Sequence, residues 1–135
     1  MAVGLVIVSH SARLAEGVVE LAAQMARGAV RLVAAGGTDE GGLGTSVQKV
    51  LTALIAAEAG DGVLVLVDLG SAGLVAEMAV EQLPERRRSR IRLSGAPLVE
   101  GAVVAAVEAS IGSSLDQVAA VAEEAATLSK LAKRT

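Results

Sequence analysis

The sequence predicts an α/β fold with an open, doubly wound, mainly parallel sheet, strand order 2-1-3-4, and helices on both faces. Short runs rich in valine and leucine alternate with longer segments of helical period, which is typical of βα units. Two of these runs are continuously apolar, as expected for strands covered on both faces. With 135 residues, 53% of them hydrophobic, residues 1–135 are expected to form one domain around one core.

The four strands are expected at residues 3–8, 30–35, 63–67 and 90–93. The last of them is interrupted by arginine, which is typical of an edge strand. Helices are expected at residues 12–27, 47–59, about 72–83 and about 99–110, with a last helix that runs from Ser114 to the basic C-terminus. Pro84 should stop the third helix, because proline lacks the amide hydrogen that would continue it.

Spacings of three and four residues predict the apolar faces of the first two helices. The first face should contain Leu14, Val18, Leu21 and Met25, and the second Val47, Val50, Leu51, Leu54 and Ile55. Capping boxes are predicted where a serine or threonine precedes a glutamine by three residues, at Thr45 with Gln48 and at Ser114 with Gln117. Basic side chains near the C-terminus suit the negative end of a helix dipole; they are Lys130, Lys133 and Arg134.

The composition excludes several classes of protein. There is no cysteine, so disulfides and thiolate metal sites are impossible, and a reducing, cytoplasmic location is expected. A net charge of −3 and the absence of Phe, Tyr and Trp argue against nucleic-acid binding. Polar residues interrupt the first apolar run long before it could cross a bilayer, so we expect no membrane segment.

The single histidine of the chain, His10, follows the first apolar run in "VIVSHS", and Asp68 follows the third in "VLVLVDLGSA". In an open parallel sheet, the ligand site lies beyond the carboxyl ends of the strands, where the strand order reverses. In the order 2-1-3-4 this point falls between strands one and three. The fold therefore predicts that His10 and Asp68 meet in one crevice.

This pairing suits phosphoryl transfer. A carboxylate that accepts the Nδ1 hydrogen of an imidazole fixes the tautomer and leaves Nε2 free to attack. Asp68 would orient the ring, and His10 would carry the phosphoryl group. The amide hydrogens at the start of the first helix could hold phosphoryl oxygens, and Ser9 and Ser11 could donate further hydrogen bonds. The alternative is that His10 only caps a helix and that Asp68 is an ordinary N-cap.

The glycine-rich segment 35–46, "AGGTDEGGLGTS", precedes a helix and could bring backbone amides close to an anion. It matches neither a Walker A motif nor the dinucleotide-binding spacing of glycines, so a surface turn or a lid over His10 are the alternatives. Gly37 and Thr38 from this segment, with Gly70 and Ser71 after Asp68, complete the candidate phosphate-supporting residues. The cluster "ERRRSRIR" at 85–92 is expected to be a solvated edge or a dock for an acidic partner.

The blocks "VIVSHSARLAEGV", "GGTDEGGLGTS", "VLVLVDLGSA" and "GAPLVEGAV", in this order, resemble DhaM, the phosphotransfer subunit family of dihydroxyacetone kinase, and in particular its mannose-type enzyme IIA domain. The resemblance covers nearly the whole chain. It implies the open α/β sheet already expected, a homodimer, and a phosphohistidine at His10 with Asp68 as its partner. Mannose-type relatives complete their dimer with an exchanged C-terminal strand, which no segment here clearly matches.

The resemblance also implies a place in a phosphoryl relay. Phosphoenolpyruvate charges Enzyme I, then the carrier HPr, then His10, which passes the group to ADP held in the kinase subunit DhaL. The resulting ATP phosphorylates dihydroxyacetone on a third subunit, DhaK. The enzyme class implied is a phosphotransferase subunit, with phospho-HPr and DhaL as direct partners. No cofactor or metal is implied.

Two rivals belong to other classes. A receiver-like signalling module would phosphorylate Asp68 itself, but it needs carboxylates after the first strand to hold Mg²⁺, and "VSHS" offers none. A non-catalytic nucleotide-binding or assembly protein would use the glycine-rich segment. Measurable binding of ATP or ADP to the isolated chain would favour it, and we expect no appreciable binding.

Overall fold

A computed structural model describes residues 2–132 of the chain. Its centre is one parallel sheet of four strands in the order β2-β1-β3-β4. The strands are β1 (Gly4–Ser9), β2 (Leu32–Gly36), β3 (Val63–Val67) and β4 (Ile91–Ser94). β1 pairs in parallel with both β2 and β3, so the switch point lies between β1 and β3. The predicted fold class and strand order are confirmed, and β4 is an edge strand as expected.

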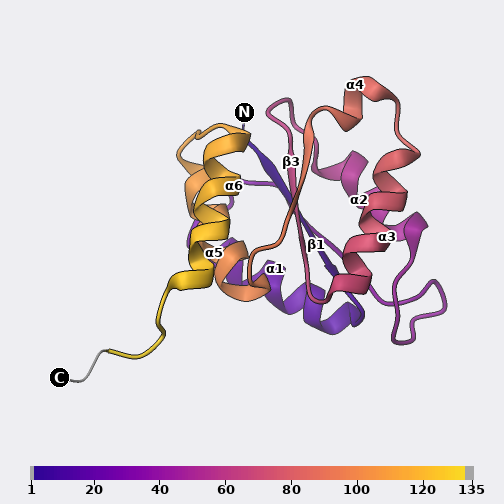
Figure 1. Ribbon diagram of the computed structural model, residues 1–135, viewed down its shortest axis with the longest axis horizontal. Helices are drawn as coiled ribbons and strands as arrows, with labels where there is room; N and C mark the ends of the chain where they lie inside the picture. The colour runs from indigo at the N-terminus through magenta and orange to yellow at the C-terminus, as the bar shows by residue number, and fades with distance from the viewer. Residues whose placement is uncertain (1, 133–135) are drawn as a thin grey trace.

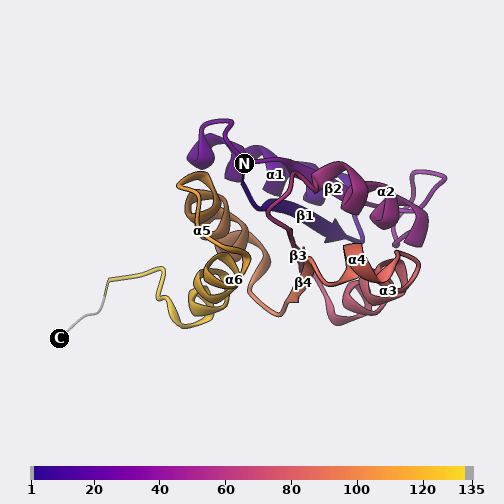
Figure 2. The ribbon, with the colours of Figure 1, turned by 90° about the horizontal axis from the view of Figure 1, so that it is seen from above.

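Six α-helices and one short 3₁₀ helix surround the sheet in the described chain. They are α1 (Ala12–Ala26), α2 (Val47–Ala57), α3 (Gly70–Glu81), α4 (Glu85–Arg88), α5 (Leu98–Ser110), α6 (Leu115–Glu124) and η1 (Ala125–Thr127). Helices α1, α5 and α6 share one apolar cluster with the sheet, and α2 and α3 share the other. Figure 1 shows the helices that connect one strand to the next. Figure 2 shows α5 and α6 on one side of the strands, and α2 and α3 on the other side. Within residues 2–132 no helix has the length and apolar character needed to cross a membrane.

The alternation of side chains along the central strands builds the two halves of the core. In β1, Leu5 and Ile7 face the cluster with α1 and α5, whereas Val6 and Val8 face the cluster with α2 and α3. β3 divides its side chains in the same way. All four of these β1 side chains are fully buried, which explains why the strand is a continuous apolar run.

The predicted apolar face of the first helix is confirmed for Val18, which is buried, and is wrong for its other three residues. Leu14, Leu21 and Met25 are 43–53% exposed, and α1 packs on the sheet through a row of mostly smaller residues, Ala15, Val18, Ala22 and Ala26. Small side chains let α1 approach the sheet and α5 closely. The same effect operates in α2, which buries Val50 and Leu54 as predicted but also Ala53 and Ala57, and leaves Ile55 half exposed.

Several helix ends differ from the predictions. Ser46, not Thr45, caps α2, and its hydroxyl accepts from the amide of Lys49. The Ser114 and Gln117 capping box is confirmed, but α6 ends at Glu124 because η1 closes it, well before the C-terminus. Lys130 therefore lies beyond the helices and pairs with Glu100, while Lys133 and Arg134 lie outside the described residues. No fifth strand occurs within 2–132.

The arginine-rich segment forms α4 and the start of β4, at the end of the sheet away from the carboxyl ends of the strands. Arg90 lies 3.7 Å from Glu58, and Arg92 pairs with Asp116. A cavity of about 330 Å³ is lined by Glu58, Arg86, Arg87 and Arg90. Most of the segment is exposed, as predicted for a solvated edge, and its docking of an acidic partner stays a prediction.

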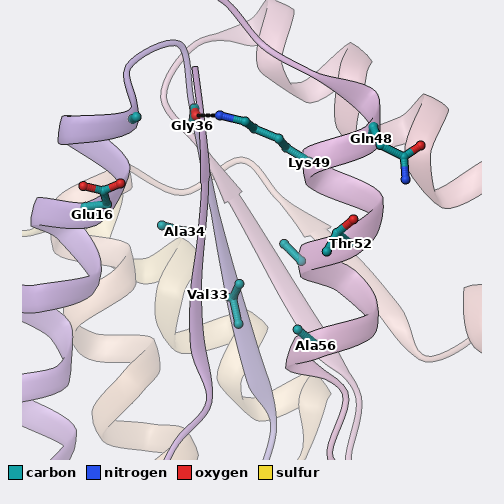
Figure 3. A pocket seen from close by; sticks show the side chains of 10 residues that line it. Glu16, Val33, Ala34, Gly36, Gln48, Lys49, Thr52 and Ala56 are labelled. Atoms are coloured by element: carbon teal, nitrogen blue, oxygen red, sulfur yellow. Dashed lines mark hydrogen bonds between the residues drawn. The ribbon is translucent and has the colours of Figure 1, made fainter. Parts of the chain in front are cut away.

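A second cavity, of about 350 Å³, runs along the edge strand β2 between α1 and α2 (Figure 3). Lys49 of α2 donates from Nζ to the Gly36 carbonyl oxygen over 3.1 Å. This bond covers an outward-facing backbone group of the edge strand, which discourages pairing with another strand. Neither His10 nor Asp68 lines this cavity.

Gly36 of β2 packs tightly against the backbone at the start of α1. A Cβ at this position would lie 2.5 Å from the Ser11 carbonyl oxygen and 2.8 Å from the Ala12 Cα, both backbone atoms. We expect Gly36→Ala to lower the free energy of unfolding by about 1–3 kcal/mol, because either strand or helix must move. Urea denaturation measures this change.

Gly17 is the matched control, because a Cβ there meets nothing within 4 Å and the residue lies inside α1. Gly17→Ala should raise stability by about 0.5–1 kcal/mol, the usual gain in a helix interior. Equal stability of the two variants would contradict the tight contact between β2 and α1.

Candidate functional site

The fold brings the two predicted residues together. His10 lies between β1 and α1, and Asp68 lies between β3 and α3, at the switch point of the sheet. The imidazole Nδ1 is 3.0 Å from Asp68 Oδ1. The His10 side chain is 30% exposed and that of Asp68 only 11%, so the acid is largely covered while the ring faces outward.

The Asp68 carboxylate accepts four hydrogen bonds. Oδ1 accepts from the His10 ring and from the Leu69 amide at 2.8 Å. Oδ2 accepts from the Ser9 hydroxyl and from the His10 main-chain amide, both at 2.9 Å. A carboxylate has about four lone-pair positions, and two donors on each oxygen occupy all of them. Asp68 is therefore held as an ion in one orientation, and it does not cap α3, whose N-cap is Leu69.

Opposing effects act on the pKa of Asp68. Burial raises it, while the hydrogen bonds from the His10 amide, the His10 ring and Ser9 lower it, with a smaller contribution from the charge of His10. The net result is a pKa below the usual value of 3.8. At neutral pH the carboxylate can only accept hydrogen bonds, so Nδ1 must carry the proton that lies between the two groups.

The other ring nitrogen, Nε2, is the reactive position. It lies 2.9 Å from the Ser71 hydroxyl oxygen, at the second residue of α3. In the neutral ring with hydrogen on Nδ1, Nε2 has a free lone pair, and the Ser71 hydroxyl donates to it. A group added to Nε2 would lie at the N-terminus of α3, where Gly70 and Ser71 begin the helix and its dipole favours negative charge.

Ser9 and Ser11 have different positions from Ser71. Ser9 is fully buried, and its hydroxyl points to Asp68 rather than toward Nε2. Ser11 is the N-cap of α1, where its hydroxyl accepts from the Leu14 amide at 3.2 Å. The hydroxyls of both serines hold the backbone next to His10 or the Asp68 carboxylate, and in the described structure neither hydroxyl bonds to the imidazole ring.

The glycine-rich loop holds the backbone of His10. The Gly44 amide donates to the His10 carbonyl oxygen at 2.8 Å, and the Gly37 amide donates to that of Ser9 at 3.2 Å. Within the loop, the Thr38 amide donates to the Gly42 carbonyl oxygen and the Gly42 amide donates to the Thr38 hydroxyl. Gly37 and Thr38 therefore lie beside the site, and neither forms a hydrogen bond with the His10 ring. Positive φ angles at Gly37, Gly41 and Gly44 explain why glycine recurs here.

The sequence did not predict that the Gly44 amide holds the His10 carbonyl oxygen, or that the Leu69 amide donates to Asp68. Because the Asp68 carboxylate accepts from the His10 amide and Gly44 donates to the carbonyl, both backbone groups of His10 are fixed by segments distant in the sequence.

A cavity of about 360 Å³ lies next to His10, between the start of α1 and the glycine-rich loop. It is lined by Ser11, Ala12, Arg13, Gly41, Gly42 and Leu43. Nowhere in residues 2–132 do three His, Cys, Asp or Glu side chains gather closely enough to hold a metal ion.

The whole sheet that positions His10 and Asp68 lies within the part of the chain that a known family model matches. The family model EIIA-man, described as the PTS system fructose IIA component, matches residues 4–119. The chain belongs to this family.

Curated relatives identify the branch of the family that it resembles. It is 45% identical over 119 residues to the phosphoryl donor subunit DhaM of the PEP-dependent dihydroxyacetone kinase of Escherichia coli. This match covers 86% of the chain but 25% of the relative, so the chain spans about a quarter of that protein's length. It is also 33% identical to the DhaM of dihydroxyacetone kinase 2 of Listeria innocua, with 86% of the chain and 93% of the relative covered.

A solved structure supports the same fold. The crystal structure of EF1359, a protein of unknown function, superposes with a TM-score of 0.80 at 33% identity and covers 92% of this chain and 95% of its own.

Proposed function

We propose that the chain is a phosphocarrier of the DhaM type, which accepts a phosphoryl group on Nε2 of His10 and passes it on. The observation that carries this proposal is the geometry of one ring: Nδ1 is bonded to Asp68 at 3.0 Å, and Nε2 faces outward at the start of α3. Relatives named as phosphoryl donor subunits of PEP-dependent dihydroxyacetone kinase support the same function.

In the first step, the Nε2 lone pair attacks the phosphorus of a phosphorylated donor. The bond between phosphorus and the donor nitrogen breaks, and its electron pair stays with the donor. The His10 ring then carries positive charge, which the Asp68 carboxylate stabilises through Nδ1–H. Ser71 is free to turn its hydroxyl from Nε2 to a phosphoryl oxygen, and the amides that begin α3 face the same charge.

In the second step, a terminal phosphate oxygen of bound ADP attacks the phosphorus, and the electron pair of the N–P bond returns to Nε2. ATP forms on the acceptor, and His10 is regenerated. We propose phospho-HPr as the donor and ADP held in DhaL as the acceptor, with DhaK using the ATP to phosphorylate dihydroxyacetone. The chain would act as one domain and as a homodimer in the cytoplasm, and the donor and the acceptor would use the same face in turn.

The rival in which Asp68 is the phosphoryl acceptor fits the structure less well. All acceptor positions of its carboxylate are engaged by hydrogen bonds, and the side chain is only 11% exposed. An attacking oxygen needs a free lone pair and a path to the phosphorus, and Asp68 has neither.

Reconstitution of the relay tests the proposal. The chain is incubated with phosphoenolpyruvate, Enzyme I and HPr, and we expect one phosphoryl group per chain that is labile to acid and stable to base. Adding DhaL with ADP should discharge it. The isolated chain should bind neither ATP nor ADP appreciably by calorimetry. Absence of labelling, or an acid-stable phosphate, would contradict the proposal.

A further inference from the structure

Two polar residues, Ser9 and Ser94, are buried within the described chain. Each is the last residue of a strand, β1 for Ser9 and β4 for Ser94. Each hydroxyl accepts from the amide two residues on, Ser9 from Ser11 at 3.0 Å and Ser94 from Ala96 at 3.1 Å. The two serines differ in one contact: Ser9 Oγ also lies 2.9 Å from Asp68 Oδ2.

The direction of the Ser9 hydrogen bond follows from proton count. A serine hydroxyl has one hydrogen. Because the Ser11 amide donates to Ser9 Oγ, that bond uses a lone pair of the oxygen and leaves the hydroxyl hydrogen for Asp68. An ionised carboxylate cannot donate in return, so the only consistent arrangement runs from the Ser11 amide through Ser9 to Asp68.

We propose that Ser9 is a positioning residue for phosphoryl transfer, which acts through Asp68 to keep the hydrogen of His10 on Nδ1. This inference rests on the proposed function and adds to it a residue that never touches the phosphoryl group. Ser9 and the His10 amide hold Oδ2, which directs Oδ1 to the ring. Without the hydroxyl, Oδ2 loses one of its two donors inside the protein, and the carboxylate can rotate away from Nδ1.

The position of Ser9 also explains why a polar residue ends an otherwise apolar strand. Along β1, Leu5 and Ile7 face the core cluster that contains α1 and α5, and strand alternation places Ser9 on the same side. A buried hydroxyl is costly unless its hydrogen bonds are satisfied. Those of Ser9 are satisfied by the amide of Ser11, the residue directly before α1, and by the Asp68 carboxylate.

The test uses Ser9→Ala with Ser94→Ala as its matched control. Both variants remove a buried hydroxyl and a bond to the amide two residues on, but only Ser9→Ala removes a donor to Asp68. Since His10 is the only histidine, ¹⁵N-histidine labelling gives one imidazole, whose nitrogen shifts report the tautomer directly. Rapid-quench measurement of phosphoryl acceptance from phospho-HPr gives the rate.

For Ser9→Ala we expect a mixture of the two imidazole tautomers and a rate lowered by about 10- to 100-fold, as when an outer partner that orients a functional side chain is removed. For Ser94→Ala we expect the single tautomer and a rate within about twofold of the unmodified chain. Ser9→Cys, which keeps a weaker donor of similar size, should show the same shift to a smaller degree and serves if the alanine variant does not fold.

A single Nδ1–H tautomer in Ser9→Ala, or equal changes in Ser94→Ala, would overturn the inference. The tautomer is measured on the unphosphorylated chain without partners, so it stands apart from the proposed function. A tautomer shift in Ser9→Ala together with no phosphorylation of the unmodified chain would contradict the proposed function alone.

Discussion

Replacement of His10 by glutamine is expected to abolish phosphoryl acceptance, with a loss of about 10⁴-fold or more, as when the nucleophile of a covalent mechanism is removed. No other histidine exists in the chain, so no second imidazole can substitute. Phosphorylation by phospho-HPr, followed with radiolabelled phosphoenolpyruvate, measures the loss.

The fold should survive this change. Asp68 keeps three of its four donors, the Ser9 hydroxyl, the Leu69 amide and the main-chain amide of residue 10. Circular dichroism and the unfolding midpoint should therefore remain close to those of the unmodified chain. Acid-labile label that persists on a folded His10→Gln variant would place the phosphoryl group elsewhere.

Asp68→Asn is expected to lower the rate of phosphoryl acceptance by about 10² to 10⁴-fold while the protein stays folded, as occurs when an orienting aspartate loses its charge. Asparagine has one acceptor oxygen and one donor group. Its NH₂ group must either face the Ser9 hydroxyl and the His10 amide, which now donate to Oδ2, or donate a hydrogen bond to Nδ1. In the second case the ring hydrogen moves to Nε2 and the attacking lone pair is lost.

Asp116→Asn is the matched control for Asp68→Asn. Asp116 lies in α6 with its side chain 84% exposed, and it pairs with Arg92 far along the chain from the site. The same chemical change there should leave the transfer rate unchanged, because Asp116 pairs with Arg92 and not with a residue of the site. It should also hardly change the stability of the fold, because exposed ion pairs contribute little to stability. Equal rates for the unmodified chain and Asp68→Asn would remove Asp68 from the mechanism.

The strands and the meeting of His10 with Asp68 were predictable, because both follow from patterns that the sequence displays directly. Continuous apolar runs such as β1 mark strands covered on both faces. Once four parallel strands are assigned, topology alone brings the ends of β1 and β3 together. A prediction about His10 and Asp68 therefore needed no knowledge of side-chain packing.

The helix faces could not be predicted in the same way, because side-chain size misled the pattern. Leu14, Leu21 and Met25 are the largest apolar residues of α1 and were assigned to its core face, yet they are half exposed. Helices α1 and α5 bury mostly alanines in the apolar cluster that they share, such as Ala22 and Ala105. A row of small residues signals such close packing, and periodicity of the large residues alone does not detect it.

The finer arrangement of the site depended on the direction of individual hydrogen bonds. The sequence predicted the same role for Ser9 and Ser11, as hydrogen-bond donors to a phosphoryl group, but Ser9 is buried and donates to Asp68. The approach of Gly44 to the His10 carbonyl depends on the path of a ten-residue loop with several left-handed glycines, and glycine content predicts such a turn without predicting its contacts.

The most direct test of the account is the nitrogen to which phosphorus is bonded. The chain is labelled with ¹⁵N-histidine, phosphorylated through HPr, and examined by NMR for coupling between ³¹P and each nitrogen of its one imidazole. Because Asp68 occupies Nδ1 and Nε2 faces outward, we predict coupling to Nε2, with the hydrogen retained on Nδ1. Coupling to Nδ1 would contradict the account, since it requires Asp68 to leave the ring.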